Sequence, residues 1–265
     1  MARTYVIANQ KGGVGKTSVA VNLSASLAHY GRRVLLVDLD PQGNATTGSG
    51  IDKTALDRNV YGVMLGEHDL ASARVRAEGG FDVIGSNRDL AGAEVELIAL
   101  ERREYRLREA LAPVLADYDH IVIDCPPALN MLTVNGFTAA DAVIIPMQCE
   151  YYALEGLTDL VGTLRKVKQN LNPGIEIEAL VRTMYDPRSA LTVQVSDELK
   201  RHYGAKVFDT VIPRNVRIAE APSFGKPVLL HDPISKGAYA HLAFARELLG
   251  RIGVAIPAET QGTHA

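Results

Sequence analysis

The segment Ile7–Thr17, IANQKGGVGKT, contains the residues of this 265-residue chain that are best suited to chemistry. A short apolar run precedes its three glycines, and a helical pattern begins directly after Lys16. In a loop between a strand and a helix, glycines let backbone N–H groups converge on an anion, and the helix start adds partial positive charge. Lys16 would reach the β- and γ-phosphates of a nucleotide, and the Thr17 hydroxyl would ligate Mg²⁺. The segment therefore predicts a phosphate-binding loop.

The loop departs from the usual phosphate-binding motif at one position. Gln10 stands where the motif has its first glycine, five residues before Gly15, and Lys11 adds a second lysine. Two ammonium groups repel one another in so small a loop unless their charge meets phosphate. The alternative interpretation is a glycine turn with two solvated lysines. The flanking strand and helix favour nucleotide binding over that alternative.

Three aspartates follow apolar runs that are typical of buried parallel strands. Asp124 ends the run HIVID, whereas Asp38 and Asp40 follow RVLLV and lie two residues apart. An extended backbone places residues at this spacing on the same side. Asp124 is the candidate for holding Mg²⁺, Asp40 for orienting or deprotonating an attacking water, and Asp38 for a supporting role. The alternatives are a turn-capping role for Asp124 and a turn-forming role, ahead of Pro41, for one of the other two.

The hydrophobic pattern alternates between strands and helices along most of the chain. Continuous apolar runs predict a first strand ending near Ala8 and further strands at 33–38, 81–85, 120–124, 142–147, 175–184 and 210–212. Helical spacing predicts helices at 17–29, at 54–78 as short pieces, at 94–117 with a kink at Pro113, and at 153–171, 191–203 and 235–251. This alternation indicates an α/β fold with a parallel sheet covered on both faces, in which ligands bind at the carboxyl ends of the strands.

The composition is that of an ordinary globular protein, with 47% hydrophobic residues, 22% charged residues and a net charge of −3. The overall charge excludes nucleic-acid binding by the chain as a whole, so any such site must be a local patch. No apolar signal segment opens the sequence, and no apolar run reaches the length of a membrane span. We expect a soluble, intracellular chain. Cys125 and Cys149 lack metal-ligand spacing and are expected to be buried thiols in a reducing compartment.

One basic region lies between Arg188 and Lys236, where eight basic and five acidic residues give a net charge of +3. The contrast with the rest of the chain is modest, and a solvated face of mixed charge would have much the same composition. Composition alone therefore leaves DNA binding the weaker interpretation of this region. A dimer would double the patch, and each phosphate contact would release counterions.

Five motifs together resemble the ParA/Soj chromosome-partitioning ATPases, of the deviant Walker-A class that includes MinD. They are KGGVGKT, VLLVDLDPQGN, IVIDCPP, PMQCEYYALEGL and VIPRNVRIAEAPSFGKPV, and the similarity extends from Ala2 to about Gly250. The resemblance implies a three-layer α/β fold with a mainly parallel, twisted sheet of about eight strands. It implies one P-loop ATPase domain over residues 1–253, followed by a flexible tail at 254–265. ATP/ADP and Mg²⁺ would be its ligands, and an ATP-dependent homodimer would sandwich two nucleotides.

The same resemblance implies roles for individual residues. Lys11 would cross to the partner's phosphates, like an arginine finger supplied in trans, and Gly12 would stay small where the partner approaches. Catalysis falls to Asp40, Lys11 and Lys16, and Mg²⁺ binding to Thr17, Asp40 and Asp124. Glu150 would contact the opposite subunit, and Met184 with Pro213, Arg214 and Asn215 would flank the adenine. The implied nucleotide-binding set is Lys11, Gly12, Gly13, Val14, Gly15, Lys16, Thr17, Ser18, Glu150, Met184, Pro213, Arg214 and Asn215.

The function that the resemblance implies is ATP-dependent DNA segregation. In this family the ATP-bound dimer binds double-stranded DNA without sequence preference, and a ParB-type centromere-binding protein releases it by stimulating slow, Mg²⁺-dependent ATP hydrolysis. Arg188 and Arg217 match arginines that are tied to DNA binding in the family, with Lys236 as a third member. A cytoplasmic, nucleoid-associated protein with no membrane partner is implied.

Two other functions need weighing. A MinD-like membrane-associated regulator would need a basic amphipathic C-terminal helix, whereas this chain ends in RIGVAIPAETQGTHA. A reductase like the nitrogenase iron protein would need two cluster-ligating cysteines per chain, and neither cysteine here stands at those positions. The chain also departs from the family at Ala128, where serine often follows CPP, and at Asn130. Both positions touch the loop that would sense the γ-phosphate and could alter the hydrolysis rate or the response to a partner.

Overall fold

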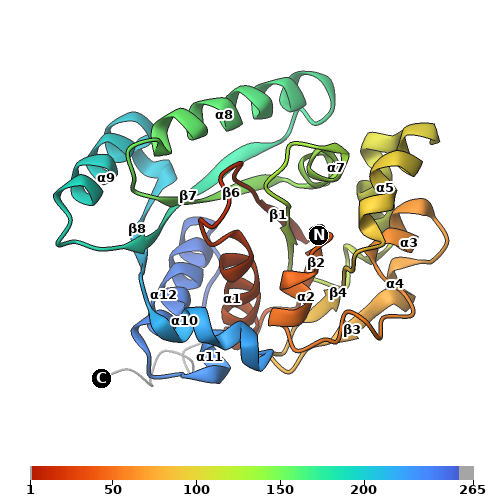
Figure 1. Ribbon diagram of the computed structural model, residues 1–265, viewed down its shortest axis with the longest axis horizontal. Helices are drawn as coiled ribbons and strands as arrows, with labels where there is room; N and C mark the ends of the chain where they lie inside the picture. The colour runs from red at the N-terminus through yellow and green to blue at the C-terminus, as the bar shows by residue number, and fades with distance from the viewer. Residues whose placement is uncertain (1, 257–265) are drawn as a thin grey trace.

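A computed structural model describes residues 2–256, and within them one eight-stranded sheet has the order β3-β4-β2-β5-β1-β6-β7-β8 (Figure 1). Its neighbouring strands pair in parallel, except that β3 pairs with β4 in the antiparallel direction. The predicted α/β fold with a mainly parallel sheet is therefore confirmed. The strands are β1 (Arg3–Ile7), β2 (Val34–Asp38), β3 (Arg74–Arg76), β4 (Asp82–Ile84), β5 (His120–Asp124), β6 (Ala142–Gln148), β7 (Glu176–Tyr185) and β8 (Val207–Pro213).

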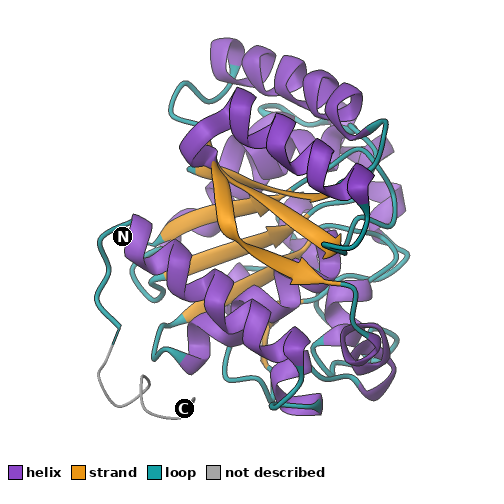
Figure 2. Cartoon of the chain, turned by 90° about the vertical axis from the view of Figure 1, so that its left-hand side faces the viewer, coloured by secondary structure: helices purple, strands orange, loops and turns teal. Residues whose placement is uncertain are grey.

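Helices cover both faces of the sheet (Figure 2). Successive residues of β1 point to opposite faces, so Tyr5 and Ile7 join a core with α1 and α12, whereas Val6 joins a core with α5 to α9. The α-helices are α1 (Lys16–His29), α2 (Asn44–Gly48), α3 (Val60–Leu65), α4 (Leu70–Ala73), α5 (Leu90–Glu96), α6 (Arg106–Leu111), α7 (Met131–Ala139), α8 (Ala153–Asn170), α9 (Ala190–Tyr203), α10 (Val216–Glu220), α11 (Val228–His231) and α12 (Lys236–Arg251). Short 3₁₀ turns are η1 (Leu97–Ala99), η2 (Arg103–Tyr105), η3 (Ala112–Val114), η4 (Gly204–Lys206) and η5 (Ala221–Phe224).

The structure differs from the predicted elements mainly in the short ones. The region 54–78 was expected to be helical, but its last part forms the edge strand β3 against β4. The single kinked helix expected at 94–117 is instead the end of α5, three 3₁₀ turns and α6, because Arg102 has a left-handed backbone with φ of 53° that no helix can contain. Helices α2, α7, α10 and α11 lie in segments for which no helix was predicted.

The C-terminal end of the described chain packs against the sheet's α1 face. Val254 and Ile256 lie partly buried against the core that α1 and α12 share, and the Arg32 guanidinium donates to the carbonyl of Ala255. The first three residues of the predicted tail are thus held in place, and the remainder, 257–265, lies outside the described residues. No helix within residues 2–256 is both long enough and apolar enough to cross a membrane.

His120, at the start of β5, should make the fold acid-sensitive. Its buried ring stacks on Tyr5, and burial lowers the pKa of the imidazole to about 4. The unfolded chain takes up this proton below about pH 6.5, so stability present above that pH is lost as the pH falls toward the folded pKa. The free energy of unfolding should therefore be lower at pH 5 than at pH 7. We expect His120→Phe, which keeps the stacked ring, to make this difference smaller by roughly 1–2 kcal/mol. Urea unfolding of both proteins at the two pH values checks this, and identical pH dependence would contradict it.

Candidate functional site

The phosphate-binding loop is tied to two strands besides the one that it follows. The Asn9 side chain donates to the carbonyl of Pro146 on β6 at 2.8 Å and accepts the Lys11 backbone N–H at 3.0 Å. The Thr183 hydroxyl, from β7, donates to the carbonyl of Val14 at 2.8 Å. These side-chain bonds fix the loop at the carboxyl edge of the sheet, as predicted for a ligand-binding loop.

The glycines of the loop serve two different needs. Gly13 and Gly15 have φ of 72° and 89°, the left-handed region in which glycine pays no steric penalty. Gly12 does not have a left-handed backbone, and a Cβ there would meet no atom of the described chain within 4 Å. The described residues of the single chain therefore give no steric reason for glycine at position 12.

Lys16 lies inside the loop rather than in solvent. It is 8% exposed, and its ammonium donates to the carbonyl of Lys11 at 3.0 Å. Burial lowers the pKa of Lys16, while the carboxylates of Asp124 and Asp40 oppose that shift. A partly desolvated cation that holds only one backbone carbonyl is well suited to an incoming anion.

Asp38 and Asp124 are register partners at the ends of β2 and β5. Asp38 is fully buried, and its oxygens accept the backbone N–H and hydroxyl of Thr46 at 2.8 and 2.7 Å and the Asp40 N–H at 3.1 Å. Burial raises the pKa of Asp38 to about 6, against these hydrogen bonds. Because its oxygens are engaged, Asp38 positions Asp40 and the start of α2; the supporting role in chemistry stays a prediction.

Asp124 has no such partners. Both of its oxygens are buried, and neither accepts a hydrogen bond of normal geometry from the described residues. Burial and the neighbouring carboxylate of Asp38 raise the pKa of Asp124 well above its usual value, and the Thr17 hydroxyl and Lys16 ammonium oppose this shift. A buried carboxylate without partners, beside the hydroxyl of Thr17, is a donor set that fits Mg²⁺.

Asp40 occupies the turn that follows β2. One of its carboxylate oxygens accepts the backbone N–H of Gln42 at 2.9 Å, and its carbonyl accepts that of Gly43 at 2.8 Å. The turn-forming role considered for one of these aspartates is thus real for Asp40. This role in the turn does not exclude a role in chemistry. The charge of Asp40 lies close enough to oppose the lowering of the Lys16 pKa and to add to the raising of the Asp124 pKa.

Lys11 and Glu150 form an ion pair across the mouth of the loop, with both side chains about half exposed. Tyr151 and Tyr152 follow Glu150 directly and are strongly exposed. Two residues that were expected to act on a second subunit therefore contact each other within one chain. The structure also gives Asn130 a local role, since its side chain caps α7 by accepting the N–H of Thr133.

A cavity of about 250 Å³ adjoins the loop on the α12 side. The residues predicted to flank a base all line it, namely Met184, Pro213, Arg214 and Asn215. Met184 has φ of 49°, a left-handed conformation that is costly for a side chain of this size and is often found at binding sites. Gly15, Ser18, Val19, Thr183, Ile212, Ile218, Ala219 and His241 complete the lining. Sequence reasoning did not find His241, Ile212 or Thr183, because only the tertiary fold brings them here.

The three candidate DNA-binding residues are exposed near this edge. Arg188 pairs with Asp186 at 2.8 Å, and Arg217 pairs with Glu220 at 3.0 Å and with Asp232 at 3.1 Å. Lys236 begins α12. The two arginines therefore carry bound acids that a polyanion would have to displace.

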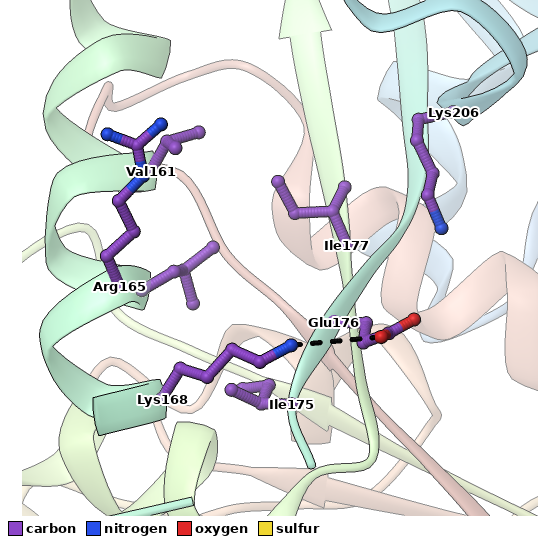
Figure 3. A pocket seen from close by; sticks show the side chains of 8 residues that line it. Val161, Arg165, Lys168, Ile175, Glu176, Ile177 and Lys206 are labelled. Carbon is purple, nitrogen blue, oxygen red and sulfur yellow. Dashed lines mark ion pairs between the residues drawn. The ribbon is translucent and has the colours of Figure 1, made fainter. Parts of the chain in front are cut away.

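A further hollow, of about 310 Å³, lies at the amino end of β7, at the opposite edge from the phosphate-binding loop (Figure 3). Apolar side chains of α8 and β7 line it, and Arg165, Lys168 and Lys206 stand around its rim. Lys168 reaches across it to Glu176 at 3.7 Å, an exposed ion pair of little energetic weight. No residue predicted for the functional site lies here. Cys125 and Cys149 do not line this hollow either, and both are buried and free, as expected.

Comparisons with known proteins find relatives that cover most of this chain. The family model described as an AAA domain matches residues 2–177. The chromosome partitioning protein ParA of Caulobacter vibrioides is 54% identical over 94% of each chain. The sporulation initiation inhibitor protein Soj of Bacillus subtilis is 51% identical over 94% of this chain and 98% of its own. A solved structure described as cobyrinic acid a,c-diamide synthase from Mycobacterium smegmatis with bound ADP and magnesium is 39% identical, with a TM-score of 0.84 and coverage of 97% of this chain and 98% of its own.

Identity above one half over nearly the whole length is far beyond what a shared fold alone produces. The phosphate-binding loop with its second lysine and the two strand-end aspartates, Asp38 and Asp124, lie within residues 2–177, which the family model matches. The chain belongs to the ParA/Soj family of chromosome-partitioning ATPases.

Proposed function

We propose that this chain binds ATP and ADP with Mg²⁺ in the loop and the adjoining cavity. Lys16 would leave the Lys11 carbonyl for the β- and γ-phosphates, and the cavity beside Met184 would receive the base. Thr17 and Asp124 would hold Mg²⁺, with Asp40 nearby, and the ion would neutralise phosphate charge. The observation that carries this proposal is the buried Lys16 ammonium facing the unpartnered Asp124 carboxylate at the carboxyl edge of the sheet.

We further propose that two chains close on two nucleotides. Gly12 supports this, because neither its backbone conformation nor any neighbour among residues 2–256 requires glycine there. Lys11 is exposed at the same rim, in a pair with Glu150 that solvent screens. In the dimer Lys11 would exchange Glu150 for the partner's phosphates and neutralise charge that develops during phosphoryl transfer.

Hydrolysis would depend on Asp40, which would orient or deprotonate the attacking water. Asp38 and Thr46 keep the Asp40 turn in place through buried hydrogen bonds. The resulting cycle is a dimer that ATP assembles and hydrolysis takes apart. We expect the whole of residues 1–253 to act as one domain in this cycle.

The dimer would bind double-stranded DNA without sequence preference and act in DNA segregation on the nucleoid. A ParB-type partner would stimulate hydrolysis and release the DNA. The partitioning relatives, at 51% and 54% identity, favour this function over that of the 39% identical protein described as a diamide synthase. The same partitioning relatives favour DNA segregation over the function of a membrane-associated MinD-like regulator. The direct test is ATPase activity with DNA and the cognate ParB-type protein, added separately and together; no stimulation by both would contradict the proposal.

Removing Arg217 should weaken DNA binding without affecting the ATP dimer. Arg217→Ala and Arg188→Ala should each lower DNA affinity about tenfold or more and reduce the slope of log affinity against log salt by about two, one phosphate contact per subunit. Arg76→Ala is the matched control, because Arg76 is also an exposed arginine paired with an aspartate but lies on β3, at the far edge of the sheet. Fluorescence anisotropy with random-sequence duplexes at several salt concentrations measures the effect. Equal losses in all three variants would show general electrostatics rather than a binding strip.

A further inference from the structure

His241 is a buried polar residue that the proposed mechanism leaves unused. It lies in α12 and is 1% exposed, yet neither ring nitrogen has a hydrogen-bond partner within residues 2–256. Buried polar groups in folded proteins are nearly always hydrogen-bonded, and leaving one without a partner is costly. An imidazole with both nitrogens unpaired therefore needs a partner that lies outside the described residues.

The ring borders the cavity beside the phosphate-binding loop. Burial lowers the pKa of His241 to about 3, so the imidazole is neutral near pH 7 and offers one N–H donor and one lone pair. A neutral ring is a poor ligand for phosphate, and the lysines of the loop already supply cations for that purpose. An uncharged donor or acceptor instead suits a single ring nitrogen or amino group of a heteroaromatic base.

Four other polar side chains line the cavity, and two of them, Thr183 and Asn215, make hydrogen bonds within the described chain, whereas Ser18 and Arg214 are the other two. The Thr183 hydroxyl donates to the loop at Val14, and the Asn215 side-chain oxygen caps α10 by accepting the N–H groups of Arg217 and Ile218. Much of the remaining wall is apolar, including Val19 and Ile212. The His241 ring thus borders a cavity of about 250 Å³, and its two buried nitrogens have no partner among the described residues.

We propose that His241 hydrogen-bonds the purine of the bound nucleotide and helps to determine which base the site accepts. The inference rests on the proposed nucleotide function. It adds α12 to the elements that recognise the ligand, through a residue that lies 225 positions beyond Lys16 in the sequence.

The test compares nucleotide affinities of His241→Phe with those of the wild-type protein. Calorimetry with Mg²⁺ measures ATP, 7-deaza-ATP and purine riboside triphosphate, which lacks the 6-amino group. The wild-type protein should bind one of the two analogues about tenfold more weakly than it binds ATP. The His241→Phe variant should bind ATP about tenfold more weakly than the wild-type protein does, and it should bind ATP and that analogue with similar affinity. His120→Phe is the matched control, because His120 is also a buried histidine with a lowered pKa but lies at the amino end of β5; it should bind like the wild type.

A measurement on the unaltered protein keeps the test independent of how the variant folds. The imidazole ¹⁵N signals of His241 should shift when ADP with Mg²⁺ is added and should stay in place when tripolyphosphate is added. Unshifted signals with ADP, or unchanged affinity and discrimination in a folded His241→Phe, would overturn the inference. Failure of the wild-type protein to bind ATP at all would instead overturn the proposed nucleotide function.

Discussion

Replacing Lys11 with alanine should abolish ATP-dependent dimerisation while leaving the affinity of the single chain for ATP almost unchanged. Lys11 is exposed at the rim of the loop, whereas the buried Lys16 is the lysine placed to hold the chain's own nucleotide. Without Lys11 the charge supplied to the partner's phosphates is lost, and hydrolysis should fall by about 10³-fold or more, as for other cations supplied in trans. Light scattering with ATP, equilibrium binding of a labelled ATP and steady-state hydrolysis measure the three quantities. Lys16→Ala should differ by losing nucleotide binding itself.

Glu150→Gln separates the two contacts that Lys11 can make. If Lys11 matters only through its ion pair with Glu150 inside one chain, this variant should lose dimerisation as Lys11→Ala does. If Lys11 acts on the partner's phosphates, the variant should still dimerise with ATP. A Lys11→Ala protein that dimerised normally would remove Lys11 from the interface altogether.

The core of the fold and most of the site could be predicted because their signals are local. Strands buried on both faces, such as Val34–Asp38 and His120–Asp124, read as unbroken apolar runs, and in parallel sheets their carboxyl ends meet at one edge. Lys16, Asp38, Asp40 and Asp124 were therefore placed together from the sequence alone. Asn130 had a local signal too, since asparagine is a preferred helix cap, and α7 could have been predicted from it.

The parts that escaped prediction depend on partners far away in the chain. Strand β3 is only Arg74–Arg76 and owes its conformation to pairing with β4. Thr183 holds the loop through a hydrogen bond to a residue 169 positions earlier, and His241 borders the cavity only because α12 packs beside α1. No spacing rule in one sequence specifies such contacts. The same holds for charge states, since burial among neighbouring carboxylates, not sequence, sets the raised pKa values of Asp38 and Asp124.

Replacing Asp40 should slow ATP hydrolysis by about 10²- to 10⁴-fold, the usual contribution of a group that positions or deprotonates a water. Nucleotide binding should persist, because Lys16 and the loop are unaltered, so the ATP dimer should accumulate on DNA. Phosphate release and retention of the protein on immobilised DNA in the presence of ATP measure the two effects. A protein that hydrolysed ATP normally without Asp40 would exclude it from catalysis.

The Asp40 prediction needs a second variant because Asp40 also shapes its own turn. Alanine removes both the carboxylate charge and the oxygen that accepts the Gln42 N–H, so a slow Asp40→Ala protein could reflect a displaced loop. Asp40→Asn keeps that acceptor and removes only the charge and the basicity. If the carboxylate acts on water, both variants should be slow, and the asparagine variant should keep the stability of the wild-type protein. If Asp40→Asn hydrolyses ATP at nearly the normal rate, the contribution of Asp40 is to the turn alone, and the group that positions the water must be sought elsewhere around the loop.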